Sequence, residues 1–157
     1  MFEKILVCLD GSKLAEQVLP YAAEEALRFD DRLILFRVVA PMTATSAAAG
    51  IAAEAIVESQ AQAQKEATSY LESVAQNLLD ERGLKVDYLV MEGLAAETIV
   101  DFADNNQIGL IAIATHGEGG LKRLVFGSVA DYVLRNSNLP MLVVKPVERG
   151  LSLRAAF

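Results

Sequence analysis

Short apolar runs alternate with longer segments of helical periodicity along this chain, and this alternation narrows the folds open to it. The apolar runs are residues 4–10, 32–39, 85–91, 108–114 and 140–146. The helical segments between them are residues 13–29, 54–82, 95–106 and 128–136. Strands that alternate with helices are joined by right-handed crossovers into a mostly parallel sheet. The sequence therefore predicts an α/β fold, a doubly wound sheet of five strands with helices on both faces.

Length and charge narrow the classes of function. The 157 residues suffice for one domain, which we expect over residues 1–147 with a tail at residues 148–157. The hydrophobic fraction of 53% indicates a sheet buried on both faces, because the run at residues 108–114 is too short to cross a bilayer. The first residues lack a basic region and a cleavage site, so we expect a cytoplasmic protein. The net charge of -7 argues against nucleic acid or an anionic membrane as partner.

Prolines, glycines and small residues mark the element boundaries. Pro20 lies inside the first helical segment and should bend or restart that helix. Residues 40–55 are mostly small and aperiodic, which predicts a mobile loop. Gly83 is placed to end the long helix. Pro140 and Pro146 bracket the fifth run, which suits an edge strand.

Two polar loops follow the first and fourth apolar runs. The first loop begins "DGS" at Asp10, and the second spans residues 114–128. In a Rossmann-like sheet of strand order 3-2-1-4-5, the first and fourth strands are neighbours at the point where the strand order reverses. Both loops then open onto one crevice at the carboxyl ends of the strands. We expect a ligand site there.

The common phosphate-binding motifs are absent, but one feature remains. The chain has neither G-x-x-x-x-G-K-[ST] nor a G-x-G-x-x-G after the first run. Gly127 and Ser128 stand at the start of the last helix, where the helix dipole favours an anion. The Ser128 hydroxyl can cap that helix, with Asp131 completing a capping box, or it can donate to a phosphate. Gly117, with further glycines beside it, allows backbone amides to approach a ligand. A flexible loop before an ordinary capped helix explains the same residues.

The segment "ATHGEGGLKRLVFGSVADYVLRNSNLPMLVVKP" resembles the C-terminal signature of the universal stress protein family. The resemblance extends to "KILVCLDGS" and "EQVLPYAAEEAL", and so covers essentially the whole chain. The family's ATP-binding branch carries G-x2-G-x9-G-[ST]. Gly117, Gly127 and Ser128 match its last three positions, whereas Ala114 occupies the first.

The resemblance implies that ATP, with Mg²⁺, lies across the crevice. It implies adenine and ribose contacts from Asp10 and the end of its strand, with Val38 near the adenine. It implies phosphate contacts from the Gly117 loop, from Gly127 and Ser128, and from the amide of Val129. The full set of implied nucleotide-binding residues is Leu9, Asp10, Val38, Ile113, Ala114, Gly117, Gly127, Ser128 and Val129.

Two residues weigh against this site. The methyl group of Ala114 interferes if the position needs a positive φ or brings the backbone against the nucleotide. Glu118 adds negative charge beside a triphosphate, which Lys122 and Arg123 can offset.

Other reactive side chains can have structural roles as well as functional ones. His116 can hold its loop in shape, and a metal role lacks a second histidine or a nearby cysteine. Asp10 can touch a phosphate-bound Mg²⁺ or can cap the next turn, as can Ser12. Cys8 reads as a buried, inert thiol. We identify no nucleophile–base pair, so we expect slow ATP hydrolysis at most.

Three functions remain open. The first is an ATP-binding, nucleotide-responsive stress module. The second is a family member without ATP that acts as a dimeric protein-interaction module. The third is a nucleotide-alpha-hydrolase-type enzyme, for which no further catalytic motif is found. We expect a homodimer through the fifth strand; the alternative is a monomer whose tail covers that edge.

Overall fold

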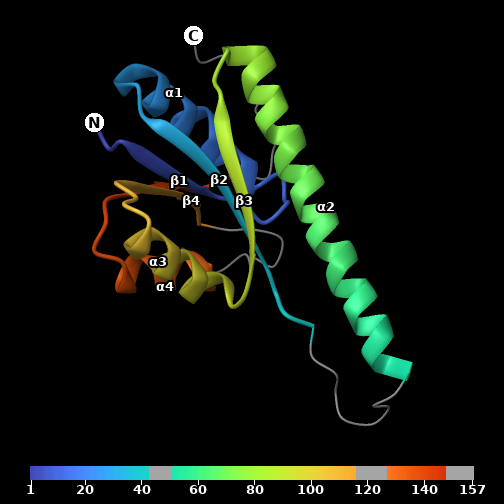
Figure 1. Cartoon of the computed structure of the whole chain (residues 1–157). Coiled ribbons are helices and arrows are strands. Elements are labelled where there is room, and N and C mark those ends of the chain that lie inside the picture. Colours follow the sequence, from blue (N-terminus) through green and yellow to red (C-terminus); the bar gives the residue numbers. More distant parts are fainter. Residues whose placement is uncertain (43–50, 116–126, 148–157) are drawn as a thin grey trace.

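The computed structural model describes residues 1–42, 51–115 and 127–147, and these residues form a five-stranded parallel sheet with helices on both faces (Figure 1). In chain order the elements are β1 (Lys4–Cys8), the short 3-10 helix η1 (Ala15–Val18), α1 (Leu19–Phe29), β2 (Arg32–Val39), α2 (Ile51–Arg82), β3 (Val86–Glu92), α3 (Ala95–Asn105), β4 (Leu110–Ala114), α4 (Ser128–Asn136) and β5 (Met141–Val144). The strand order is β3-β2-β1-β4-β5, which confirms the predicted fold and order.

The central strand β1 positions the rest of the sheet. It pairs in parallel with β2 on one side and with β4 on the other, so that Cys8 lies opposite both Phe36 and Ile113. The chain reverses direction across the sheet between β1 and β4. The predicted switch point is therefore present, and it brings the carboxyl ends of β1 and β4 side by side.

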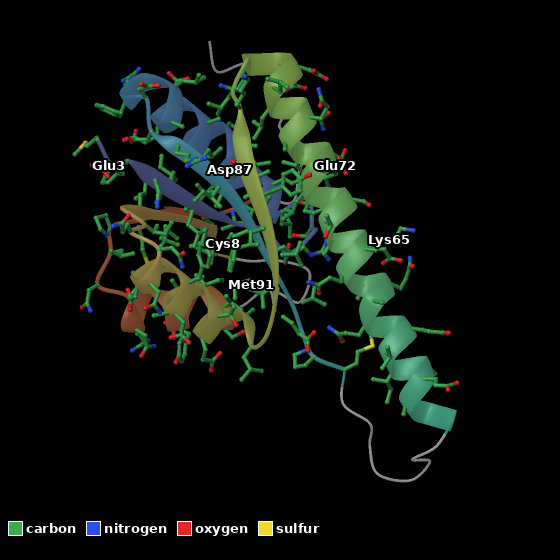
Figure 2. The ribbon with its side chains drawn as sticks, viewed as in Figure 1. Glu3, Cys8, Lys65, Glu72, Asp87 and Met91 are labelled. Atoms are coloured by element: carbon green, nitrogen blue, oxygen red, sulfur yellow. The ribbon has the colours of Figure 1, made fainter. Side chains whose placement is uncertain are left out.

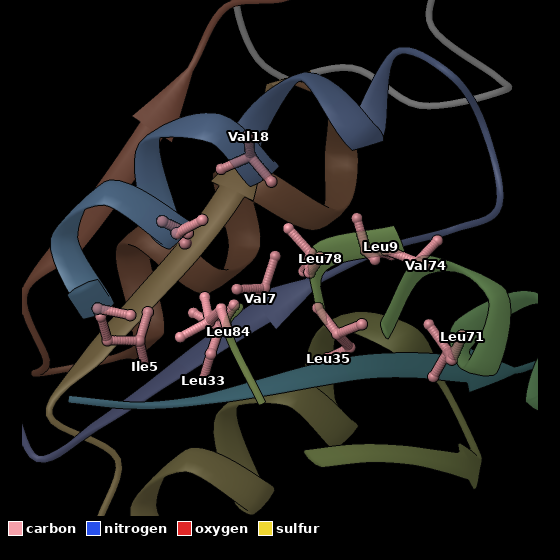
Figure 3. Close-up of a cluster of buried hydrophobic side chains, with 14 of the residues drawn as sticks. Ile5, Val7, Leu9, Val18, Leu33, Leu35, Leu71, Val74, Leu78 and Leu84 are labelled. Carbon is pink, nitrogen blue, oxygen red and sulfur yellow. The ribbon is translucent and has the colours of Figure 1, made fainter. Parts of the chain in front are cut away.

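Two hydrophobic cores cover the two faces of the sheet. On one face, α1 and α2 pack against alternate residues of the strands, and Figure 3 shows this cluster around Val7, Leu35 and Leu71. On the other face, α3 and α4 pack against the intervening residues, which include Cys8 and Ile113. Because both faces are covered, the strand runs are almost continuously apolar, as in parallel sheets generally.

The boundary residues behave as the sequence predicts, with one exception. Pro20 lies in the first turn of α1, which restarts after η1. Gly83 follows α2 with φ +65°, the left-handed conformation of a helix end. The strand β5 lies at a sheet edge.

The exception is the start of α2. The helix begins at Ile51, so the predicted loop over residues 40–55 is wrong for its last five residues. Alanine-rich sequence is intrinsically helical, which accounts for the earlier start. The remainder of that loop, residues 43–50, lies outside the described residues.

Helix α2 is longer than the sheet that it covers. At 32 residues it measures about 48 Å, and Figure 1 shows its first half running past β3. Among residues 53–82 of this helix, the buried side chains are all in the second half: Ala67, Leu71, Val74 and Leu78. Figure 2 shows Lys65 on the side of α2 that faces away from the sheet. In the described residues, no helix is long and apolar enough to span a membrane.

The amino end of the sheet is fastened by one buried carboxylate. Asp31, whose side chain is 2% exposed, accepts hydrogen bonds from the Met1 ammonium (2.6 Å), the Phe2 amide (3.0 Å) and the Glu3 amide (2.8 Å). Burial acts to raise the pKa of Asp31, but these hydrogen bonds outweigh it and leave the pKa lowered. The chain before β1 is thereby tied to the start of β2.

Candidate functional site

The carboxyl ends of β1 and β4 form an apolar floor. Leu9, Ile113 and Ala114 are all buried there. The Leu9 amide donates to the Phe36 carbonyl of β2 (2.9 Å), so the chain stays in the sheet up to this point. The structure therefore places these three predicted residues at the adjoining carboxyl ends of β1 and β4.

Val38 lies at the carboxyl end of β2 and packs, half-buried, with the cluster on the α3/α4 face. Ile113 belongs to the same cluster, whereas Leu9 belongs to the cluster on the α1/α2 face. The predicted apolar residues therefore come from both sides of the sheet edge.

The loop after β1 holds its own shape through short-range hydrogen bonds. The Ser12 amide donates to Asp10 Oδ1 (2.9 Å), and the Ala15 amide donates to Ser12 Oγ (3.1 Å). Gly11 has φ +94°, a conformation that favours glycine. Both predicted capping roles, for Asp10 and Ser12, are confirmed. The Asp10 side chain is also exposed, so the cap does not bury it.

Ala114 is the last residue of β4, and the structure answers one of the two concerns about its methyl group. It pairs with Val144 of β5 in regular parallel register and is 7% exposed. It is not among the described residues with positive φ. The position therefore imposes no backbone strain on alanine.

Helix α4 begins one residue earlier than the predicted Ser128 cap requires. The N-cap is Gly127, at φ -70° and ψ 158°, and Ser128 is the first helical residue, with no side-chain cap. The Gly127 amide donates to the Thr115 carbonyl (2.5 Å), which ties the helix start to the end of β4. The predicted Ser128 cap is therefore wrong, because the extended Gly127 takes the cap position.

The predicted capping box is wrong as well. The Asp131 carboxylate accepts instead from Arg135 Nε (2.9 Å), one turn further along. Ser128 is exposed at the first turn, where backbone amides have no partner within the helix. Together with the amide of Val129, this end of α4 offers donors beside the carboxyl end of β4.

The middle of the second loop lies outside the described residues. This applies to Gly117, His116, Glu118, Lys122 and Arg123. The predicted contact from Gly117 and the charge balance around Glu118 stay predictions.

Two residues of this region were missed by the sequence analysis. Arg37 of β2 lies with its Cζ atom 5.2 Å from the centre of the Tyr70 ring of α2. The Tyr70 hydroxyl donates to Glu16 Oε1 of η1 (3.2 Å). Burial raises the pKa of Tyr70, and the neighbouring charge of Glu16 raises it further. A charged residue inside the run "LILFRVV" was the available signal for Arg37.

The reactive groups nearby have limited chemistry. Cys8 is buried, as predicted, and burial raises its pKa to about 12, which disfavours the reactive thiolate. Among residues 1–42, 51–115 and 127–147, no group of three or more His, Cys, Asp or Glu side chains is arranged to hold a metal ion. Of the described residues, Asp10 fits Mg²⁺ as a single carboxylate beside a cation held mainly by phosphates.

Comparison with known proteins gives a consistent picture. The model of the universal stress protein family matches residues 1–145. Universal stress protein MJ0531 of Methanocaldococcus jannaschii is 32% identical over 145 residues, which are 92% of this chain and 83% of that protein.

Solved structures agree in fold. The structure of MJ0577, a second universal stress protein of that archaeon, has a TM-score of 0.81 at 28% identity and covers 95% of this chain and 99% of its own. A universal stress protein family member of Arabidopsis thaliana, solved with AMP bound, has a TM-score of 0.65 at 15% identity and covers 92% of both chains.

Proposed function

This chain belongs to the universal stress protein family, and on that premise we propose that it binds an adenine nucleotide, ATP, at the carboxyl ends of β1 and β4. One observation carries the proposal. The start of α4 is tied to the end of β4 by the Gly127–Thr115 hydrogen bond, while the Asp10 loop leaves the neighbouring strand β1. Amide donors and a carboxylate thus flank an apolar floor. The AMP-bound family member of the same fold supports the ligand class.

The roles of the residues follow from their chemistry. Asp10, as an exposed carboxylate, accepts from ribose hydroxyls, and Val38 and Ile113 contact the adenine. Ser128 and the amide of Val129 bind the phosphates, helped by the positive end of the α4 dipole. Leu9, Ala114, Gly117 and Gly127 complete the proposed site.

Mg²⁺ accompanies the triphosphate in this proposal. Mg²⁺ keeps several waters and binds through one or two carboxylates plus phosphate oxygens. Asp10 is the residue that supplies the carboxylate. When bound, the cation offsets the charge of the triphosphate.

The output of binding is regulatory. Because the sequence offers no identifiable nucleophile–base pair, we expect at most slow ATP hydrolysis. We therefore assign the chain, as one domain over residues 1–147 acting in the cytoplasm, to a nucleotide-responsive stress or regulatory module. Nucleotide occupancy then changes the surface that protein partners meet.

The edge strand β5 favours a homodimer, and it also favours the second candidate function, a dimeric interaction module without ATP. Met141 to Val144 are half-buried on both faces, and among the strands that the structure describes β5 pairs with β4 alone. An apolar edge strand is a template for pairing with another chain. Sedimentation of the protein with and without nucleotide separates the two candidates, since only the first couples assembly to a ligand.

Calorimetric titration with ATP and Mg²⁺ tests the proposed function. The wild-type protein should bind with a Kd below about 1 mM. Ser128→Ala should weaken binding about five-fold, because it removes one hydrogen bond to a charged group. Ser69→Ala, an exposed serine of α2, is the matched control and should bind as the wild type does.

Ala114→Gly completes the test. Since Ala114 sits in β4 without backbone strain, this variant should change affinity by less than about three-fold. No binding by wild type or Ala114→Gly at about 10 mM ATP overturns the nucleotide proposal and leaves the interaction module.

A further inference from the structure

The guanidinium of Arg37 contacts the loop that carries Asp10. Arg37 points to the α1/α2 face, because it continues the alternation of Leu33 and Leu35, which belong to that core. A Cβ atom at Gly11 would lie 2.9 Å from Arg37 Nη1 and 3.0 Å from both Cζ and Nη2. Three guanidinium atoms are thus about equally distant from that point. The flat face of the guanidinium is turned towards Gly11.

Tyr70 holds the guanidinium in this place. Arg37 Cζ lies 5.2 Å from the centre of the Tyr70 ring, within the range of a cation–π interaction. Within residues 1–42, 51–115 and 127–147, no carboxylate lies within ion-pair distance of Arg37. Stacking on Tyr70, and not an ion pair with these residues, therefore fixes the side chain.

Tyr70 is fixed in turn to the far end of the same loop. Its hydroxyl donates to Glu16 Oε1 (3.2 Å), and Glu16 pairs with Lys13 (2.7 Å). Lys13 and Glu16 follow Gly11 within one short stretch of chain that turns into η1. The loop is thus contacted at Gly11 by Arg37 and at Glu16 by Tyr70.

The charges of this group act on one another. Asp10 and Glu16 both raise the pKa of Tyr70, whereas Arg37 lowers it. Asp10, Glu16 and Arg37 therefore all lie near enough to Tyr70 for their charges to act on its hydroxyl.

We propose that Arg37 is a positioning residue for nucleotide binding: stacked on Tyr70, it sets the conformation of Gly11 and thereby the direction of Asp10. This inference rests on the proposed nucleotide site. Arg37 acts through the loop and needs no contact with the ligand. Pre-organising a loop in its bound conformation raises affinity by lowering the entropy lost on binding.

The proposal explains why an arginine and a glycine occupy these positions. Lysine keeps the charge but has no planar group to lie against Gly11 and the Tyr70 ring. A side chain at Gly11 would meet the guanidinium and would also need a φ of +94°. The two residues therefore depend on each other.

Four variants test the stack. Arg37→Lys removes the planar group and retains the charge. Tyr70→Leu removes the ring, whereas Tyr70→Phe retains the ring and removes only the bond to Glu16. Arg32→Lys is the matched control, because Arg32 lies on the same strand at its amino end and pairs with Asp87.

Two measurements are made on each variant. The first is ATP affinity by calorimetry. The second is amide hydrogen exchange at Ser12 and Ala15, whose amides donate to Asp10 Oδ1 and Ser12 Oγ. Exchange requires no nucleotide, so it tests the ordering of the loop separately from the proposed function.

Arg37→Lys and Tyr70→Leu should each weaken ATP binding about ten-fold and speed exchange at both amides about as much. The double variant should be little worse than either single variant, because both remove one interaction. Tyr70→Phe should lose less than Tyr70→Leu, and Arg32→Lys should match the wild type.

The possible failures are distinct. A wild type that binds no nucleotide overturns the proposed function, whatever the exchange data show. A wild type that binds, with Arg37→Lys of equal affinity, overturns the positioning role. Unchanged exchange at Ser12 and Ala15 in both Arg37→Lys and Tyr70→Leu overturns the ordering of the loop by the stack.

Discussion

The two ends of the sheet are built in opposite ways. At the amino end, the Asp31 carboxylate is buried under three hydrogen bonds, and Gly109 lies so close to the Phe2 carbonyl that a Cβ has no room. At the carboxyl end, Asp10 and Ser128 are exposed and Arg37 is half-buried. At the amino end the carboxylate is buried and hydrogen-bonded, while at the carboxyl end polar side chains are exposed to solvent.

This difference implies that the amino end of the sheet contributes mainly to stability and the carboxyl end mainly to binding. Polar groups that are buried and hydrogen-bonded stabilise the fold, and their loss is costly. Exposed polar groups at the carboxyl end contribute less to folding, because they lose little contact with water when the chain folds. Substitutions at one end should therefore change the free energy of unfolding, and substitutions at the other should change nucleotide affinity.

The largest effect should come from Gly109→Ala. The new Cβ would clash with the Phe2 carbonyl oxygen, a backbone atom that cannot move without shifting the chain before β1. We expect the free energy of unfolding to fall by about 3 kcal/mol in urea titrations. Gly83→Asn is the control, since Gly83 has open space around it and asparagine tolerates its φ of +65°. Equal losses in both variants contradict the close contact at Gly109.

Asp31→Asn should cost about 2 kcal/mol at neutral pH, because an amide cannot accept all the hydrogen bonds of the carboxylate. The lowered pKa of Asp31 gives a pH signature. The carboxylate's contribution is present above its unfolded pKa of about 3.9 and is lost as pH falls through the lower folded pKa. The gap between wild type and Asp31→Asn should therefore narrow in acid.

Urea titrations at a series of pH values measure that gap. Asp30→Asn is the matched control: it removes the same charge at an exposed neighbour whose φ of +57° suits asparagine. A gap of constant size down to low pH would show that the Asp31 charge does not stabilise the fold.

Gly11→Ala should have a small effect on stability and a larger effect on ATP affinity, the opposite of Gly109→Ala. Alanine at φ +94° costs about 1 kcal/mol of stability, and the contacting atoms are the mobile end of Arg37. ATP affinity should fall about ten-fold, because the loop and Arg37 both shift. Calorimetry and urea titration of one preparation compare the two effects. If Gly11→Ala lowers the free energy of unfolding but not the ATP affinity, then Gly11 contributes to folding and not to nucleotide binding.

The smallest effect concerns whether a reagent can reach Cys8 from the carboxyl end of the sheet in the folded protein. Because burial raises the pKa of Cys8 to about 12, the folded protein should not react with a disulfide reagent at pH 8, while the urea-unfolded protein should. Absorbance of the released thiolate measures this. Rapid reaction of the folded protein would show that the opening extends past Leu9 into the sheet.

The same contrast explains what the sequence could predict. The apolar runs report burial on both faces, so the elements follow from them, whereas the β3-β2-β1-β4-β5 order was expected from the Rossmann-like class of sheet. The Ser128 cap fails because the choice of cap residue depends on the hydrogen bond from Gly127 to Thr115, which local sequence does not encode. Arg37 and Tyr70 meet only through the packing of α2 on β2. The effect of the Ala114 methyl group could not be judged from the sequence, because it depends on the backbone conformation that Ala114 adopts as the last residue of β4.

If the proposed site is correct, the nucleotide binds at the carboxyl end of the sheet and leaves the amino end unchanged. Amide chemical shifts of the labelled protein, followed by NMR during titration with ATP and Mg²⁺, test it most directly. We expect saturable shifts at Gly11, Ser12, Ser128 and Val129, with none at Glu3 or Gly109. Shifts centred on the amino end, or no shifts at about 10 mM ATP, would contradict it.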